Sequence, residues 1–128
     1  MLKIKLGMVG GGKDAFIGEV HRMAARLDNR YELVAGALSS NAKRAAQSAL
    51  EIGIDKRRSY SSYKEMAAKE GKLKSGIDAV AIVTPNHLHA DVAKEFLKAG
   101  IHIICDKPLT SSLQDAEELA ALVKSSGL

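Results

Sequence analysis

Short apolar runs alternate with segments of helical periodicity along the whole chain. The apolar runs are short enough for strands and end at turn-forming residues. They predict strands at residues 2–9, 31–38, 77–83 and 101–105. The periodic segments predict helices at residues 17–27, 41–52 and 87–98, from Ser61 or Ser62 onward, and from Thr110 or Ser111 onward. Because strands and helices alternate, the chain favours the α/β class, with a doubly wound parallel sheet in one domain over residues 1–128.

The apolar positions also predict which faces are buried. Residues 77–83 form the most apolar segment, which is typical of a central strand covered on both faces. Helical spacing predicts the sheet-facing side of the first helix: Ile17, Val20, Ala24 and Leu27. The same spacing predicts the apolar face of the last helix: Leu113, Leu119, Leu122 and Val123.

Residues suited to helix caps stand at the predicted helix ends. Asn41 is expected to cap the second helix and Gly53 to end it. Ser62, followed by Glu65 three residues later, is typical of a capping box, in which side chain and backbone bond reciprocally. Gly100 is expected to close the helix at residues 87–98.

Composition and charge argue against nucleic-acid and membrane-spanning proteins. The 128 residues are 46% hydrophobic and 27% charged, as in ordinary globular domains. The net charge of +4 invites a nucleic-acid partner, but basic residues are mixed with acidic ones. Aromatic residues make up 4% of the chain and tryptophan is absent, so a stacking platform for bases is not expected. No apolar stretch approaches the ~20 residues that a membrane span needs.

Cysteine use and the N-terminal sequence predict a cytoplasmic protein. Cys105 is the only cysteine, which excludes an intrachain disulfide and a multi-cysteine metal site. Residues 1–5 alternate in charge and run directly into a strand pattern, unlike a signal peptide. We therefore expect a reducing compartment, with Cys105 as a small core residue rather than a nucleophile.

The first predicted strand ends in a glycine-rich turn. A dinucleotide fingerprint needs one glycine for the turn, one for close approach of a pyrophosphate and one for helix–strand packing. Gly10, Gly12 and Gly18 can fill these roles in order. Five residues separate Gly12 from Gly18, where the usual pattern has two, so we expect a longer loop. The alternative is a glycine turn with a purely structural role.

The second predicted strand lacks the acidic residue that commonly binds the adenosine ribose. Ser39 and Ser40 follow this strand, and Lys43 and Arg44 come next. Without a carboxylate nothing repels a 2′-phosphate, so these residues favour NADP slightly over NAD. The alternative is that Asn41 is simply a helix cap and the basic side chains are solvated.

The segment after the central strand breaks abruptly at Pro85, because proline has no N–H to continue a ladder. Such a break is expected to present Asn86 to a ligand at the carboxyl edge of the sheet. His87 and His89 are two residues apart and would point in different directions on a helix, so we predict no metal site. For His89, a buried or capping role and a ligand contact both remain open.

Lys107 follows the last predicted strand and is the candidate catalytic residue. A partly desolvated ammonium at this place can hydrogen-bond a substrate hydroxyl or carbonyl and transfer a proton. Asp106 beside it is a candidate to hold the ammonium in position. The alternative is an ordinary surface ion pair on a loop.

Three motifs together resemble the Gfo/Idh/MocA family of oxidoreductases, which includes glucose–fructose oxidoreductase and inositol dehydrogenase. The resemblance spans nearly the whole chain. The motifs are the glycine turn with Gly18-Glu19-Val20-His21, the segment Thr84-Pro85-Asn86-His87-Leu88-His89, and Asp106-Lys107-Pro108-Leu109.

The resemblance implies a Rossmann domain of an NAD(P)-dependent enzyme that transfers a hydride at a hydroxyl or carbonyl group of a sugar, a cyclitol or a derivative. It implies a cofactor site that includes Thr84, Pro85, Asn86 and His89. The family's Glu-Lys-Pro motif maps onto Asp106, Lys107 and Pro108, and the shorter Asp106 departs from it. A cis peptide bond between Lys107 and Pro108 is a further implied feature.

The resemblance also implies a second, substrate-binding domain with a catalytic His and Asp, which this sequence does not include. We therefore expect a Rossmann sheet that is incomplete at its C-terminal end, little turnover by this chain alone, and exposed apolar surface that favours a homo-oligomer. Two alternatives remain: a nucleotide-binding module that senses redox state without catalysis, and a Rossmann-like domain that binds no cofactor.

Overall fold

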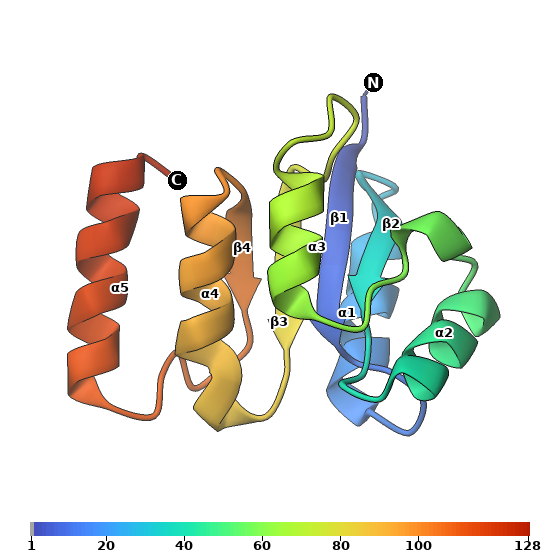
Figure 1. Cartoon of the computed structure of the whole chain (residues 1–128), viewed down its shortest axis with the longest axis horizontal. Coiled ribbons are helices and arrows are strands. Elements are labelled where there is room, and N and C mark those ends of the chain that lie inside the picture. Colours follow the sequence, from blue (N-terminus) through green and yellow to red (C-terminus); the bar gives the residue numbers. More distant parts are fainter. Residues whose placement is uncertain (1) are drawn as a thin grey trace.

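The computed structural model describes residues 2–128 and contains one parallel four-stranded sheet. The strands are β1 (Ile4–Gly10), β2 (Tyr31–Ala37), β3 (Ala79–Val83) and β4 (His102–Cys105). Their order across the sheet is β2-β1-β3-β4, and every neighbouring pair is parallel (Figure 1). The chain therefore crosses back over β1 between β2 and β3, which confirms the predicted doubly wound arrangement.

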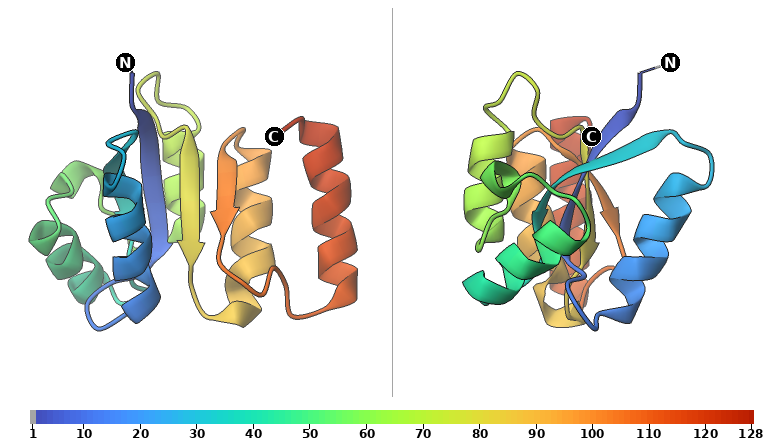
Figure 2. Two further views of the ribbon diagram at one scale, coloured as in Figure 1. Left: turned by 180° about the vertical axis from the view of Figure 1, so that it is seen from behind. Right: turned by 90° about the vertical axis from the view of Figure 1, so that its right-hand side faces the viewer.

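Helices cover both faces of this sheet. They are α1 (Phe16–Arg26), α2 (Ala42–Glu51), α3 (Tyr63–Glu70), α4 (His89–Lys98) and α5 (Leu113–Ser126), with short 3₁₀ turns at Lys56–Arg58 and Asn86–Leu88. Helices α3, α4 and α5 lie on one face, α1 lies on the other, and α2 lies beside β2 (Figure 2). Both ends of the described chain lie at the amino edge of the strands, so the carboxyl edge is formed by loops (Figure 1).

The core is continuous on both sides of β3. All five residues of β3 are buried, as predicted for a central strand. Val80 and Ile82 belong to the cluster beneath α3 and α4, which also contains Phe96. Ala79 and Ala81 belong to the opposite cluster.

The caps follow the prediction at two helices and differ at two others. Asn41 accepts from the Arg44 N–H at 3.0 Å and caps α2, as predicted. Ser62 caps α3, but the Glu65 carboxylate binds Lys69 at 2.6 Å rather than returning to Ser62, so the capping box is only half formed. Ser112, not Thr110 or Ser111, caps α5: its hydroxyl accepts from the Asp115 N–H at 3.2 Å. Gly100 has the positive φ of a helix stop.

The predicted sheet-facing sides of the first and last helices were only partly correct. In α1, Ile17 packs on the core, but Leu27 is 84% exposed and Val20 is 39% exposed. Close contact of Gly18 with the glycine turn rotates α1, so that tertiary packing overrides the apolar periodicity. In α5, Leu119 is buried as predicted, whereas Leu113 is 75% exposed. Val123 is exposed as well.

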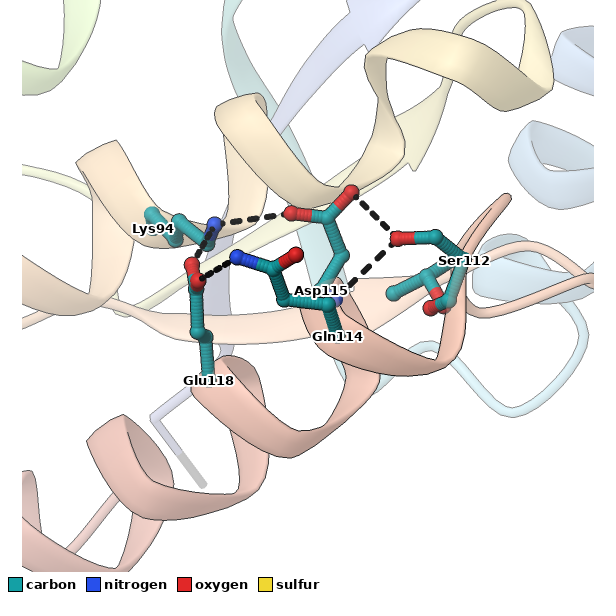
Figure 3. A network of polar contacts seen from close by, with 6 residues as sticks. Lys94, Ser112, Gln114, Asp115 and Glu118 are labelled. Carbon is teal, nitrogen blue, oxygen red and sulfur yellow. Dashed lines mark hydrogen bonds and ion pairs between the residues drawn. The ribbon is translucent and has the colours of Figure 1, made fainter.

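Ion pairs attach α5 to α4 at their solvent-facing side. The Lys94 ammonium donates to Asp115 Oδ1 at 3.0 Å and to Glu118 Oε2 at 2.6 Å (Figure 3). Gln114 and Ser112 bind the same two carboxylates from α5 and its cap. Lys94 lowers the pKa of both carboxyl groups by hydrogen bonding, and they raise the pKa of Lys94 in return.

Replacing Lys94 by methionine is expected to make thermal stability less sensitive to acid. The ordinary pKa values of Glu118 and Asp115 are 4.5 and 3.8, and both are lowered in the folded state. The two carboxylates therefore stabilise the folded state at pH values above their ordinary pKa values. This stabilisation is lost as the pH falls through the lowered pKa values. The melting temperatures of the parent and Lys94→Met should therefore differ near neutral pH and converge below about pH 4. Lys98→Met, at an exposed site on the same helix, is the matched control. A difference between parent and Lys94→Met that does not change with pH would contradict this account.

Across residues 2–128, no helix is both long enough and apolar enough to cross a membrane.

Candidate functional site

A cavity of about 820 Å³ lies at the carboxyl edge of the sheet. This edge, where β1 and β3 diverge toward crossovers on opposite sides, is where parallel α/β sheets bind ligands. The cavity is lined by the glycine turn, by the ends of β2 and β3, and by the segments that begin α2 and α3. Of the predicted site residues, it collects Gly10, Gly12, Ser39, Ser40, Arg44, Thr84 and Pro85. Gly18, Asn86, His89, Asp106, Lys107 and Pro108 are not among its lining residues.

Two glycines in the turn and one in α1 are required by close backbone contacts. Gly10 has a φ of +80°, and a Cβ there would lie 2.9 Å from the Thr84 nitrogen. Gly11 also has a positive φ, and it packs directly against Gly18. A Cβ on Gly18 would lie 2.4 Å from the Gly11 Cα, so α1 can approach the turn only with glycine at this position. Gly18 thus has the helix–strand packing geometry that was predicted for the third glycine, and Gly11 is its unpredicted partner.

The extra loop residues after Gly12 are tied to the end of β2 and to α2. The Gly12 N–H donates to the Leu38 carbonyl at 3.1 Å, and the Lys13 N–H donates to the Ser48 hydroxyl at 3.0 Å. Ser48 is buried on α2, so the loop is fixed to the second βα unit. A Cβ on Gly12 would meet the Leu38 carbonyl oxygen at 2.8 Å. In this structure, Gly12 is therefore packed against β2 in addition to lining the cavity.

The N-terminus of α1 has no side-chain cap. The N-cap residue Ala15 has no side-chain acceptor for the first N–H groups of the helix, whereas Asn41 supplies one for α2. The Ala15 N–H itself donates to the Gly12 carbonyl at 3.0 Å. Unpaired N–H groups at a helix start, with the positive end of the helix dipole, attract a phosphate.

Arg22 holds the glycine turn from the side of α1. Its guanidinium donates to the Gly11 carbonyl at 2.7 Å and lies 3.6 Å from the Met8 sulfur. Burial lowers the pKa of Arg22, with Glu19 opposing the shift. The contact fixes the Gly11 carbonyl toward α1. The sequence pattern did not indicate this residue, because the contact depends on how α1 is rotated.

The β2 end of the cavity carries polar side chains, and the carboxylate among the cavity's lining residues, Asp14, belongs to the loop after β1 instead. Ser39, Ser40 and Arg44 line it, and Lys43 does not. The Ser39 hydroxyl accepts from the Asn41 N–H at 3.1 Å, which orders the turn into α2. Asn41 is therefore a helix cap, and Arg44 lines the cavity.

Residues that the sequence analysis missed form another wall of the cavity. Ser61, Ser62 and Tyr63 line it from the start of α3. They arrive there because Ser59 forms a parallel bridge with Gly36 beside β2, so the chain leaves this bridge at the carboxyl edge. The bridge joins residues 23 positions apart and has no local sequence signal.

His89 is buried rather than exposed to the cavity. Its residue is 0% exposed, and both ring nitrogens lie near backbone carbonyl oxygens. Of the two roles left open by the sequence, the structure has the buried one. Asn86 and His87 are exposed on the 3₁₀ turn before α4. Among residues 2–128, no group of three or more His, Cys, Asp and Glu side chains is placed to hold a metal ion.

Lys107 is exposed on the loop after β4, and its peptide bond to Pro108 is cis, as the resemblance implied. The predicted partial desolvation is absent in this structure. Asp106 does not bind Lys107; its Oδ1 lies 3.3 Å from His21 Nε2 on α1. The side chains of Asp106 and Lys107 therefore have different surroundings. His21 is the partner of Asp106 that the sequence analysis missed.

Cys105 is a neutral thiol at the end of β4. Burial, and then the Asp106 carboxylate, raise the pKa of Cys105 to about 11. A thiol with such a pKa carries very little thiolate at neutral pH, which agrees with a core residue rather than a nucleophile.

Comparison with known proteins identifies relatives of this arrangement. The sequence model of the GFO_IDH_MocA family, described as "Oxidoreductase family, NAD-binding Rossmann fold", matches residues 4–128. The uncharacterized oxidoreductase YfiI of Bacillus subtilis is 38% identical over 97% of this chain and 32% of its own length.

Solved structures agree with this match. An oxidoreductase from Sinorhizobium meliloti is 64% identical with a TM-score of 0.93, over 97% of this chain and 34% of that one. An inositol dehydrogenase homologue from Azotobacter vinelandii, complexed with NADH and myo-inositol, is 36% identical with a TM-score of 0.95, over 98% of this chain and 33% of that one. The chain thus spans about a third of the length of these relatives.

Proposed function

We propose, from the premise that this chain belongs to the GFO_IDH_MocA family of oxidoreductases, that it forms the cofactor-binding part of an NAD(P)-dependent dehydrogenase or reductase. The proposed substrate is a sugar, a cyclitol or a derivative, whose hydroxyl or carbonyl group exchanges a hydride with the cofactor. The observation that supports this most is the 820 Å³ cavity, which is framed by the glycine turn at the carboxyl edge of the sheet.

The residues present fit a dinucleotide. The open N-terminus of α1 and the glycine turn offer backbone N–H groups and close approach for a pyrophosphate. Ser39, Ser40 and Arg44 would hold the adenosine ribose. Thr84 and Pro85 would line the path toward the nicotinamide, at the end of the central strand. The bound cofactor would supply the hydride acceptor or donor.

Lys107 is the residue that we propose to act on the substrate. It follows β4, next to the strand end that carries Thr84, and its ammonium is exposed and free to reach a ligand at this edge. There it would donate a hydrogen bond to the reacting oxygen and carry the proton that this oxygen loses or gains. Asp106 would not hold the Lys107 ammonium in position. Its contact with His21 would instead orient the start of the loop that carries Lys107.

We further propose a preference for NADP. Arg44 reaches the cavity at the end of β2, where two serines stand in place of an acidic residue. Arg44→Ala is expected to weaken NADPH binding about 10-fold, because a surface-exposed contact to a 2′-phosphate is lost, and to leave NADH binding within about twofold. Calorimetric titration of both nucleotides measures this, and Lys43→Ala, one residue away and outside the cavity lining, is the matched control. Equal losses for both nucleotides would contradict the assigned role of Arg44.

A nucleotide-sensing module without catalysis is the second candidate. The exposed lysine after β4 is the feature against it, since a sensor needs no proton donor beside the cofactor. The Lys107 experiment in the Discussion distinguishes the two.

A further inference from the structure

His89 stands between the two segments that the proposed reaction needs. It is the first residue of α4 and is fully buried. On one side lies Thr84, which follows β3 and lines the cavity. On the other side lies Pro108, which is bonded to Lys107.

Both ring nitrogens of His89 face main-chain acceptors. Nδ1 lies 2.7 Å from the Pro108 carbonyl oxygen, and Nε2 lies 3.0 Å from the Thr84 carbonyl oxygen. A carbonyl oxygen accepts but cannot donate, so each hydrogen bond requires a hydrogen on the ring nitrogen concerned. A neutral ring has one N–H and makes one of the two bonds, whereas the imidazolium cation has two and makes both. A side chain that served only to fill space would need neither.

The ring acts where the main-chain ladder between β3 and β4 ends. The ladder reaches the Asp106 N–H, which donates to the Ile82 carbonyl at 3.0 Å. Past this bond the two segments diverge, one toward Pro85 and the other toward Pro108. Proline has no N–H, so neither residue can extend the ladder. The imidazole bridges the segments at this point.

We propose that His89 is a positioning residue, whose ring lies between the cofactor-lining segment and the lysine-bearing segment and holds them in one arrangement by hydrogen bonding to their main-chain carbonyl groups. This inference rests on the proposed function, which makes the relative placement of Thr84 and Lys107 important. His89 itself touches neither cofactor nor substrate, because its side chain is buried beneath both segments.

Nitrogen NMR of the unaltered chain tests the hydrogen bonding of the ring without any variant or cofactor. With histidine labelled by ¹⁵N, a ring N–H signal of His89 should be present and should exchange slowly with water, because the ring is buried and hydrogen-bonded. A ring N–H of His89 that exchanges as fast as that of the exposed His102 would overturn the proposal. This measurement does not depend on whether the chain binds a nucleotide. The role of His89 and the proposed function can therefore be contradicted independently of each other.

Two variants test the positioning role. His89→Phe keeps a ring of similar size and removes the ring nitrogens, and it is expected to weaken NADH binding about 10-fold. His89→Gln retains an amide donor and should recover part of this loss. In both variants the backbone amide signals of Thr84, Asn86, Asp106, Lys107 and Leu109 should shift, while those of α2 stay in place.

A second histidine provides the control for these variants. His102→Gln changes an exposed histidine at the amino end of β4 and should leave both NADH affinity and these signals unchanged. If a folded His89→Phe chain binds NADH within about twofold of the parent, the positioning role is wrong. If His89→Phe does not fold, His89→Gln decides: unchanged signals in both segments would overturn the proposal.

Discussion

An enzyme that carries this chain is expected to lose turnover by about 10²- to 10⁴-fold when Lys107 is replaced by alanine, the range that positioned proton donors contribute. The physical reason is that the ammonium donates to the reacting oxygen where charge develops, and alanine leaves this oxygen without a donor. NADH binding should change by no more than about twofold, because Lys107 does not line the cavity. Steady-state kinetics and a separate NADH titration measure the two quantities.

Lys124→Ala, an exposed lysine in the last turn of α5, is the matched control for a lost surface charge. Unchanged turnover in Lys107→Ala would exclude Lys107 from proton transfer, whereas an absence of turnover in the parent enzyme would favour the nucleotide-sensing alternative. A loss of NADH affinity equal to the loss of turnover would instead place Lys107 in cofactor binding.

Replacing Glu70 by alanine is expected to destabilise the fold by about 3–5 kcal/mol, the cost of leaving a buried charge without its partner. The Glu70 side chain is 0% exposed and accepts from three groups: the Arg58 guanidinium, the Tyr60 hydroxyl at 2.8 Å and the Ile77 N–H at 3.2 Å. Hydrogen bonding to Glu70 raises the pKa of Arg58, and burial followed by Glu70 raises the pKa of Tyr60. Removing the carboxylate leaves the Tyr60 hydroxyl and the Ile77 N–H without this acceptor, and leaves the Arg58 guanidinium with only the Ser75 carbonyl at 3.4 Å.

Thermal unfolding of Glu70→Ala should occur about 10–20 °C below that of the parent, from the usual relation between free energy and melting temperature for a domain of this size. Glu65→Ala on the same helix is the control, since Glu65 belongs to an exposed pair with Lys69 and should change stability by less than about 1 kcal/mol. Equal shifts for the two variants would show that the Glu70 network contributes no more than a surface ion pair.

The fold could be predicted from the sequence because its signals are local. Apolar runs, helical spacing and caps such as Asn41 depend on residues close together in the chain. The face of α1 was mispredicted because the contact of Gly18 with Gly11 decides it, and side-chain periodicity does not record backbone contact. The cap of α5 was placed too early because three hydroxyl residues precede the helix, and it is the hydroxyl of Ser112, on an extended backbone, that accepts from the Asp115 N–H.

The part of the candidate site that lies directly after the strands could be predicted from the sequence. Residues after β1, β2 and β3 meet in one cavity because parallel strands share a carboxyl edge. The wall at Ser61–Tyr63 and the pair formed by His21 and Asp106 depend on segments that only the folded chain brings together. For the same reason, the sequence left the role of His89 open. Only the folded structure shows its ring buried between the carbonyl groups of Thr84 and Pro108.

Calorimetric titration of this chain with NADH and NADPH tests the central claim most directly. The account predicts saturable binding of one nucleotide per chain, with NADPH bound more tightly than NADH. Absence of binding to either nucleotide, by a chain whose circular dichroism confirms its fold, would contradict the assignment of the carboxyl-edge cavity as a dinucleotide site.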